Sequence, residues 1–474
     1  MTMTWTLHPD RALPADPTTR PIAREIYQAV AGLPVVSMHG HVPVEWFAQD
    51  TAFSDPADLL VVPDHYLIRM LVSQGATLPE LGIPALDGSA PAETDPRQIW
   101  RRFCAGWRHF RGTPTRFWIE TELVEIFGVT ERPGPDTADA IYDRIAAVMA
   151  EESFRPRALL DRFRIETIAT TDPAWATLDD HATLREQGWG DRIRPTWRPD
   201  PVLAVDSPTF AADVQRLGQA AGIDPTSYAA YLDALRAQRE RFKRAGALAT
   251  DHGPFLADTT PMDAADAAAL WDRAMRGASV STAERDAFTA HMLFQLATMA
   301  ADDHLVMQLH PGVCRGHASA QTARFGADRG YDIPVAVEFT EALRPVLDAF
   351  GHHPGFRMIA FTIDEDTFSR ELAPLAGAYP SLRVGAPWWF LDAPDAMRRF
   401  REAVTETAGF ANVSGFVDDT RAFCSIPARH DLARRVDAGY LARLVAEHRL
   451  DLDEAIDTAT DLAYRLPVQA YAAQ

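Results

Sequence analysis

The chain has 474 residues, 47% of them hydrophobic, so it can bury a core of considerable size. That length fits two or three ordinary domains, or one large α/β barrel with insertions. A net charge of −20 excludes the basic surface that nucleic acids and anionic membranes attract, and we expect neither as a partner. If such an acidic protein binds an acidic ligand, it must concentrate positive charge locally, through a few arginines or a metal ion.

The first segment of the chain lacks the apolar stretch and cleavage signal of a secretory leader. No run approaches the roughly 18–20 apolar residues that span a bilayer. Cys104, Cys314 and Cys424 are scattered and show no CxxC spacing, which favours reduced thiols. The expected location is the bacterial cytoplasm.

Short apolar or β-branched runs recur along the chain, each followed by polar residues and most by a helical pattern. The runs cover residues 34–38, 165–171, 193–197, 247–250, 305–309, 358–363, 382–386 and 413–417. Eight βα units in series predict a (β/α)8 TIM-type barrel, with its chemistry at the carboxyl ends of the strands. A doubly wound open sheet is the alternative, but no Gly-rich phosphate loop follows the first run.

Two spacings are too long for simple crossovers. About 120 residues separate the first two runs, and they show helical periodicity at Pro96–Trp107 and Ala138–Met149. The stretch from about 201 to 300 also has mostly helical patterns, as at Met262–Met275. We therefore predict a single barrel over residues 1–474, with a helical insertion at about 50–160 and a further one at about 201–300.

The first run ends at His39-Gly40-His41. Residues two apart in a strand point to the same side, so both imidazoles can reach one cation; alone, the motif fits two unrelated surface histidines equally well. In a closed barrel the eighth strand lies beside the first, which brings Asp419 to the pair. Two histidines and one carboxylate leave coordination positions open, as in catalytic sites. We expect one divalent metal, with zinc as first choice and manganese, iron or cobalt as alternatives.

Lys243 is the only lysine in the chain. It lies in a helical segment before the fourth run, not at a strand end. This position disfavours a binuclear hydrolase that bridges its metals with a carboxylated lysine, and it disfavours a lysine Schiff base.

With these residues placed, the sequence resembles the uronate isomerase family, a distant branch of the amidohydrolase superfamily. The ordered motifs that carry the resemblance are HGH at 39–41, PDHY at 63–66, TTDP at 170–173, RPD at 198–200, AGALATDHG at 245–253, VMQLHPGVCR at 306–315, WWF at 388–390 and DDTRAFCSIPARHD at 418–431. Met38 and Gly40 depart from the family, which usually has an acidic or aromatic residue before the motif and often Cys between the histidines. The match covers nearly the whole chain.

The resemblance implies an aldose–ketose isomerase that interconverts D-glucuronate with D-fructuronate, D-galacturonate with D-tagaturonate, or both, by proton transfer through an enediol. It implies one metal ion held by His39, His41 and Asp419. By similarity, the substrate site contains His65, Tyr66, Arg198, His310, Arg315, Trp389 and Arg421. We also expect a homo-oligomer.

The residue types suit this chemistry. A planar arginine fork binds a carboxylate better than lysine does, so Arg198 and Arg315 are candidates for gripping the uronate, with a structural ion pair as the alternative for each. Arg421 follows Asp419 closely enough to act on the same oxygens. Asp419 is the hypothetical acceptor of a proton from a substrate hydroxyl.

Tyr66, next to His65, is expected to donate or relay a proton once an adjacent cation lowers its pKa. The segment also fits a helix start with Asp64 as N-cap. His310 is either a further metal ligand or, as we favour, a partner for a substrate hydroxyl.

Four residues near the later runs receive supporting roles. Trp389, with Trp388, is expected to form a pocket wall, although tryptophan pairs more often belong to a core. His430 and Arg429 are expected to support the metal ligand behind the last strand.

Two other functions compete with an isomerase. A mononuclear metal-dependent hydrolase, such as a lactonase or deaminase, would use the same His pair and Asp with a metal-bound hydroxide. A non-catalytic sugar-acid binding protein is the third interpretation, disfavoured because such proteins are usually exported.

Overall fold

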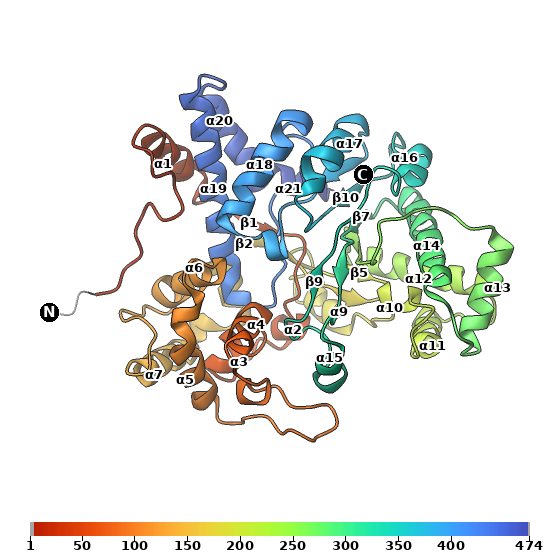
Figure 1. Cartoon of the computed structure of the whole chain (residues 1–474), viewed down its shortest axis with the longest axis horizontal. Helices are drawn as coiled ribbons and strands as arrows, with labels where there is room; N and C mark the ends of the chain where they lie inside the picture. Colours follow the sequence, from red (N-terminus) through yellow and green to blue (C-terminus); the bar gives the residue numbers. More distant parts are fainter. Residues whose placement is uncertain (1–3, 473–474) are drawn as a thin grey trace.

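Parallel strands form the centre of the fold in residues 4–472, the part that this computed structural model describes (Figure 1). One sheet has the order β1 (Val35–Ser37), β2 (Ile165–Ala169) and β4 (Ile193–Arg194). The other has the order β11 (Leu382–Val384), β10 (Met358–Ala360), β7 (Val306–Leu309), β6 (Ala249–His252), β5 (Trp197–Arg198) and β3 (Asp172–Pro173). A short antiparallel pair joins β8 (Val313–Cys314) to β9 (Ile333–Pro334). The chain is thus an α/β protein with parallel sheets, as predicted at this level.

The two sheets are continuous along the chain. β3 follows β2 after Thr170 and Thr171, and β5 follows β4 after Pro195 and Thr196. We count β2 with β3, and β4 with β5, as one strand each, and leave the β8–β9 pair aside. Strands that are neighbours in space are then neighbours in the sequence, from β1 to β11. This order lacks the reversal that marks a doubly wound sheet.

The eighth predicted strand, residues 413–417, is not a regular strand. Only Val413 pairs, in a single parallel bridge with Val384. Gly415 has a φ of +77°, a left-handed conformation that interrupts an extended backbone, so the prediction of a strand here is wrong. The end of this segment nevertheless reaches β1, because the backbone N–H of Asp419 donates to the carbonyl of His39 at 3.1 Å.

The segment between β1 and β2 is helical, as its periodicity predicted. α5 (Pro96–Gly106) begins where the carboxylate of Asp95 caps the backbone N–H of Arg97. α7 (Ala138–Met149) packs against α5, and the indole N–H of Trp100 donates to the carbonyl of Ala138 at 2.9 Å. The other helices of this segment are α2 (Val44–Gln49), α3 (Pro56–Leu60), α4 (His65–Ser73), α6 (Pro114–Thr121) and α8 (Pro156–Arg162). Their buried side chains form one hydrophobic cluster together with residues of β1, β2 and β4.

A second group of helices lies on the other side of the strands (Figure 1). Before β6 it contains α10 (Asp200–Leu203), α11 (Phe210–Ala221) and α12 (Tyr228–Arg244); after β6 it contains α13 (Ala264–Met275) and α14 (Thr282–Asp303). Lys243 lies in the last turn of α12 and donates to the carbonyl of Asp303, which precedes β7, at 2.7 Å, so it does not lie at the carboxyl end of a strand. This contact fits the prediction that Lys243 lies in a helix and not at a strand end.

The remaining helices are α1 (Thr19–Val30), α9 (Asp179–Glu186), α15 (Ser319–Phe325), α16 (Arg344–Phe350), α17 (Ala373–Ala378), α18 (Pro394–Ala408), α19 (Ile426–Ala446), α20 (Leu452–Thr460) and α21 (Leu466–Ala470). Within the described residues, no helix combines the length and apolar character needed to cross a membrane. The three cysteines are free thiols, as predicted.

Candidate active site

A cavity of about 480 Å³ opens where the parallel strands end. His310 follows β7 directly, Gly253 follows β6, and Arg198 ends β5. The structure brings all the predicted site residues to this one cavity: His39, His41, His65, Tyr66, Arg198, His310, Arg315, Trp389, Asp419 and Arg421. Parallel strands explain the grouping, because their carboxyl ends share one edge.

His39, His41 and Asp419 form a compact group in the cavity wall. The Oδ1 atom of Asp419 lies 3.3 Å from Nε2 of His39 and 3.1 Å from Nε2 of His41. Neither ring nitrogen of the buried His39 makes a hydrogen bond. Two imidazole nitrogens and a carboxylate oxygen that converge in this way are a donor set that fits a divalent cation, so this group could hold a metal ion.

The electrostatics of this group also suit a cation. Burial alone lowers the pKa of His39, but the carboxylates of Asp251 and Asp419 outweigh it and raise the pKa to about 9. Burial would raise the pKa of Asp419, yet its contacts with His39 and His41 hold it far below the ordinary value. The site therefore concentrates negative charge that attracts a proton or a metal ion.

Two non-glycine residues in the cavity wall have left-handed backbone conformations. The φ angles are +52° for Trp389 and +42° for Asp419. Such conformations cost free energy and persist where the surrounding structure enforces them, often at functional sites. Here they set the directions of the Asp419 carboxylate, which could hold a metal ion, and of an aromatic wall.

Arginine side chains supply positive charge around the cavity. Arg198 is held by Asp200, with Nε 2.9 Å from Oδ2, and by Asp251, with Nη1 3.2 Å from Oδ2. Arg421 donates through Nη2 to Asp328 at 2.8 Å. Arg315 is partly exposed and lies over the ring of Trp389, 5.5 Å from its centroid. Each of these arginines thus pairs with a carboxylate and also lines the cavity.

Two opposing effects act on the pKa of Tyr66. Its hydroxyl is buried and has no hydrogen-bond partner, and burial raises its pKa well above 10 although nearby Arg429 lowers it. Here desolvation outweighs the neighbouring guanidinium, so the net shift of this pKa is opposite to the one that an adjacent cation alone would cause. The role of Tyr66 as a proton donor stays a prediction. Asp64 caps α4, accepting from the N–H of Tyr66 at 2.8 Å, so the helix-start interpretation is confirmed.

His65 stacks on Tyr66, with ring centroids 4.4 Å apart. Burial and the charge of Arg421 lower its pKa to about 4, so the ring is neutral near pH 7. A neutral imidazole and a neutral phenol therefore stand side by side at the start of α4. Such a pair can donate and accept hydrogen bonds without carrying charge.

Behind the metal-binding group, the helix α19 supplies two buried side chains. His430 lies with Nε2 3.1 Å from Oδ2 of Asp418, the neighbour of Asp419. Arg429 is fully buried and donates through Nη1 to Asp392 at 2.6 Å. The contact of His430 with Asp418, together with donation by Arg429 to the carbonyl of Asp418 at 3.4 Å, fixes the segment that carries Asp419.

Some cavity residues were not assigned by the sequence analysis. Arg69, Asp172, Asp328, Asp332 and Phe390 also line the cavity. Arg69 carried a usable signal, because it lies four residues after His65 and so on the same helix face. Asp328 and Asp332 carried none, since they sit in the irregular connection that ends at β9.

A parallel α/β fold with a buried His–His–Asp group and several arginines at its strand ends defines a ligand-binding site that could hold a metal ion. The family model for glucuronate isomerase matches residues 18–471. This chain therefore belongs to the glucuronate (uronate) isomerase family.

Relatives confirm the assignment over nearly the full length. The uronate isomerase of Rhizobium meliloti (strain 1021) is 52% identical over 465 residues, covering 98% of this chain and 99% of the relative. The structure of glucuronate isomerase from Caulobacter crescentus has a TM-score of 0.95 at 47% identity, covering 98% of this chain and 97% of that one. The structure of uronate isomerase from Thermotoga maritima has a TM-score of 0.90 at 25% identity, covering 98% and 100%.

Proposed function

We propose that this protein is a uronate isomerase that interconverts the aldose and ketose forms of a hexuronic acid: D-glucuronate with D-fructuronate, D-galacturonate with D-tagaturonate, or both. Family membership supports the reaction class. The observation that carries the proposal for this chain is the cavity itself, where the His39–His41–Asp419 group and several arginines face the same space.

The architecture that we propose is a (β/α)8 TIM-type barrel formed by one chain. The sequential strand order and the contact of residues 413–420 with both β11 and the end of β1 support it. Residues of about 50–160 and about 201–300 are then helical insertions. The hydrophobic cluster that the first insertion shares with β1, β2 and β4 supports treating it as a subdomain packed beside the barrel.

The substrate carboxylate is assigned to the arginines. Arg198 is half-buried and fixed by two carboxylates, whereas Arg315 is exposed and loosely paired, with Nη1 3.6 Å from Asp332. A planar guanidinium can hold a carboxylate with two parallel hydrogen bonds. Trp389 closes one wall, and His310 is placed to meet a sugar hydroxyl.

The metal ion that we propose is held by His39, His41 and Asp419, with zinc as first choice and manganese, iron or cobalt as alternatives. When bound, a divalent cation in this position polarises neighbouring substrate oxygens. The three side chains fix where those oxygens lie.

Isomerisation moves a proton from C2 to C1 and another from the C2 hydroxyl to the C1 oxygen. Asp419 is the proposed acceptor of the hydroxyl proton. Tyr66, which stays neutral because of burial, is the proposed hydrogen-bond donor to the carbonyl oxygen, with His65 beside it. Arg421 lies next to the same oxygens and stabilises negative charge that develops on them.

The test is proton NMR of the metal-replete protein with D-glucuronate, and separately with D-galacturonate, in deuterated water. Growth of ketose signals that stops after chelation with EDTA and resumes with added metal supports the proposal. Deuterium in the product supports proton transfer over a hydride shift. No conversion of either sugar by protein with bound metal would overturn the assignment and favour the hydrolase alternative.

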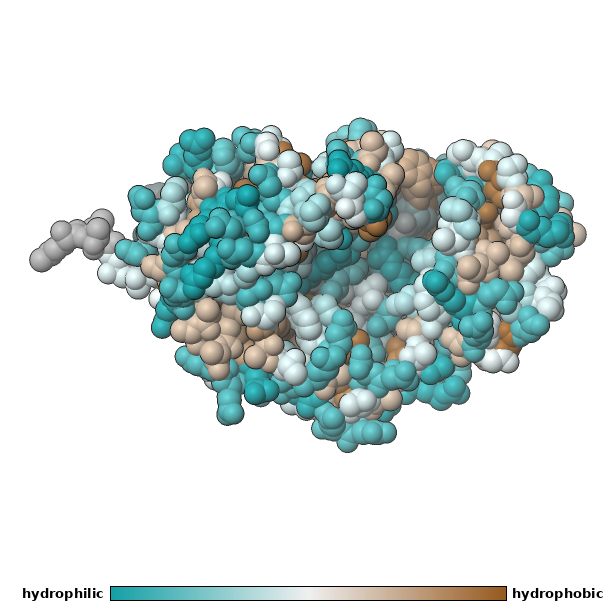
Figure 2. Space-filling view, turned by 90° about the horizontal axis from the view of Figure 1, so that it is seen from below, coloured by the Kyte–Doolittle hydropathy of each residue, from teal (hydrophilic) through white to brown (hydrophobic). Residues whose placement is uncertain are grey.

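We further propose a homo-oligomer in the bacterial cytoplasm. Phe255 and Leu256 are large apolar side chains that are 44% and 43% exposed, next to one another on the loop after β6. Most of the face shown in Figure 2 is hydrophilic, with a hollow near its middle. Exposed apolar residues form only small patches on that face. Light scattering of the purified protein measures the assembly directly.

A further inference from the structure

Asp251, in the segment Thr250-Asp251-His252-Gly253, lies behind two residues of the cavity wall, Arg198 and His310, but has no part in the proposed reaction. Its side chain is fully buried at the end of β6. Oδ1 is 2.7 Å from Nε2 of His310, and Oδ2 is 3.2 Å from Nη1 of Arg198. One carboxylate therefore contacts two residues that the proposed function assigns to the substrate.

The contact with His310 determines which ring nitrogen carries a hydrogen. A carboxylate paired with a guanidinium only accepts hydrogen bonds, so Nε2 of His310 must donate. In the neutral ring, Nδ1 is then an acceptor. Nδ1 is buried and has no hydrogen-bond partner within the protein, and His310 lines the cavity. A buried acceptor without a partner is costly unless a ligand supplies the donor.

Gly253 provides an independent observation that this arrangement is built into the fold. A Cβ atom on Gly253 would lie 2.6 Å from Cε1 of His310 and 2.9 Å from Nη2 of Arg198. Both side chains thus occupy the space that a larger residue would fill. The backbone N–H of Gly253 also donates to Asp200, the second partner of Arg198.

A different role for the same residues is a second metal site, because ligand atoms of His39, Asp251 and His310 lie close together. Two observations disfavour it. The Nε2 atom of His310 that would face the ion already donates its hydrogen to Asp251 at 2.7 Å. The Arg198 guanidinium 3.2 Å from Asp251 would also repel a second cation.

We propose that Asp251 is a positioning residue that holds His310 with its hydrogen on Nε2, so that Nδ1 accepts a hydrogen bond from a substrate hydroxyl, and that it fixes Arg198 for the substrate carboxylate. This inference rests on the proposed isomerase function for the identity of the ligand. The ring tautomer can be measured without any turnover.

The first experiment is nitrogen-15 NMR of the metal-replete protein labelled at histidine, with the His310 signals assigned by their loss in His310→Gln. The expected spectrum has a protonated Nε2 and an unprotonated Nδ1. Hydrogen on Nδ1, in a neutral or a doubly protonated ring, would overturn the proposal. Because this measurement uses no substrate and an otherwise unaltered site, it stands apart from a failure of the isomerase assay.

The second experiment is Asp251→Asn, in which the amide can donate as well as accept. We expect kcat/KM to fall about 10- to 100-fold, the scale typical of a residue that orients another functional group, with a raised KM and altered His310 signals. Metal analysis should find the wild-type number of ions per chain. Wild-type kcat and KM, or the loss of one ion per chain, would contradict a positioning role.

Asp303→Asn is the matched control, because it breaks the Arg239–Asp303 pair, with distances of 2.6 and 3.0 Å, outside the cavity. It should leave kcat, KM and the His310 signals unchanged. If it reproduced the losses of Asp251→Asn, those losses would reflect general destabilisation and the proposal would fail. Should Asp251→Asn not fold, the wild-type spectrum alone decides.

Discussion

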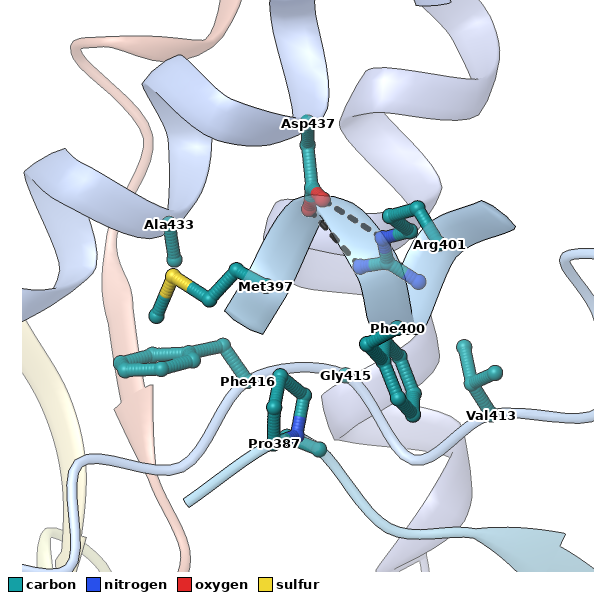
Figure 3. Close-up of a pocket in the computed structure, with 10 residues that line it drawn as sticks. Pro387, Met397, Phe400, Arg401, Val413, Gly415, Phe416, Ala433 and Asp437 are labelled. Atoms are coloured by element: carbon teal, nitrogen blue, oxygen red, sulfur yellow. Dashed lines mark hydrogen bonds and ion pairs between the residues drawn. The ribbon is translucent and has the colours of Figure 1, made fainter. Parts of the chain in front are cut away.

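Two cavities of this molecule contain buried arginine–carboxylate pairs, but they differ in what the pairs leave unsatisfied. The small one, of about 20 Å³, lies among Met397, Phe400, Val413 and Phe416 (Figure 3). There, Arg401 donates through Nε and Nη2 to the two oxygens of Asp437 at 2.6 and 2.8 Å. Each partner satisfies the other, and apolar side chains complete the wall.

The cavity of about 480 Å³ at the strand ends is different. The Tyr66 hydroxyl, Nδ1 of His310 and both ring nitrogens of His39 are buried without a hydrogen-bond partner. Buried polar groups are normally paired, so a group of unpaired ones that face one space indicates an absent ligand. The comparison teaches that unsatisfied polar atoms, more than charge as such, distinguish a functional cavity from a structural one.

The largest expected effect is at the metal-binding group. Asp419→Asn removes the one negatively charged ligand of the three, and we expect kcat/KM to fall at least about 10³-fold, the scale seen when a carboxylate that acts with other catalytic groups is removed. Metal content by plasma mass spectrometry should fall in parallel. Activity and metal content at wild-type levels would mean that the His–His–Asp group is not the metal site.

The structural cavity should respond in stability instead. Asp437→Asn leaves the buried Arg401 guanidinium without its counter-charge, and we expect the free energy of unfolding to fall by about 3 kcal/mol. Urea titration followed by tryptophan fluorescence measures it. Activity of the folded variant at low temperature should be unchanged, and a raised KM would show that the two cavities are coupled.

Gly253→Ala tests the packing of the functional cavity. The added methyl group must displace His310 or Arg198, so we expect a loss of about 100-fold in kcat/KM, as for a misplacement near 1 Å. Gly134→Ala is the matched control, since its Cβ would meet only Thr137 Oγ1, at 3.8 Å. Equal kinetics for the two variants would show that the site tolerates the displacement.

The smallest effect is expected outside both cavities. Ser281 caps α14 in a reciprocal arrangement with Glu284, and Ser281→Ala should lower the free energy of unfolding by about 1 kcal/mol. Thermal melts and steady-state kinetics of the same preparation measure it. A change in KM would be unexpected, because this cap lies on the surface away from the cavity lining.

Much of the site was predictable because strand ends have a sequence signature. Arg198 and His310 each follow a short apolar run, and parallel strands place such residues at one edge. The helix start at Asp64 was equally predictable from the sequence, because a capping aspartate precedes an apolar pattern. Neither signal describes the irregular connection that places Asp328 against Arg421.

The sequence by itself determined the α/β class, the order of the strands and the residues at their ends, because periodicity and motif spacing are local properties. Only the tertiary structure decided the protonation state of Tyr66 and the partners of Asp251. Both depend on burial and on charges from elements distant in the chain, as Arg429 near Tyr66 and Arg198 near Asp251 show. It also decided that residues 413–417 form no regular strand, because Gly415 takes a left-handed conformation where the segment passes from β11 toward β1.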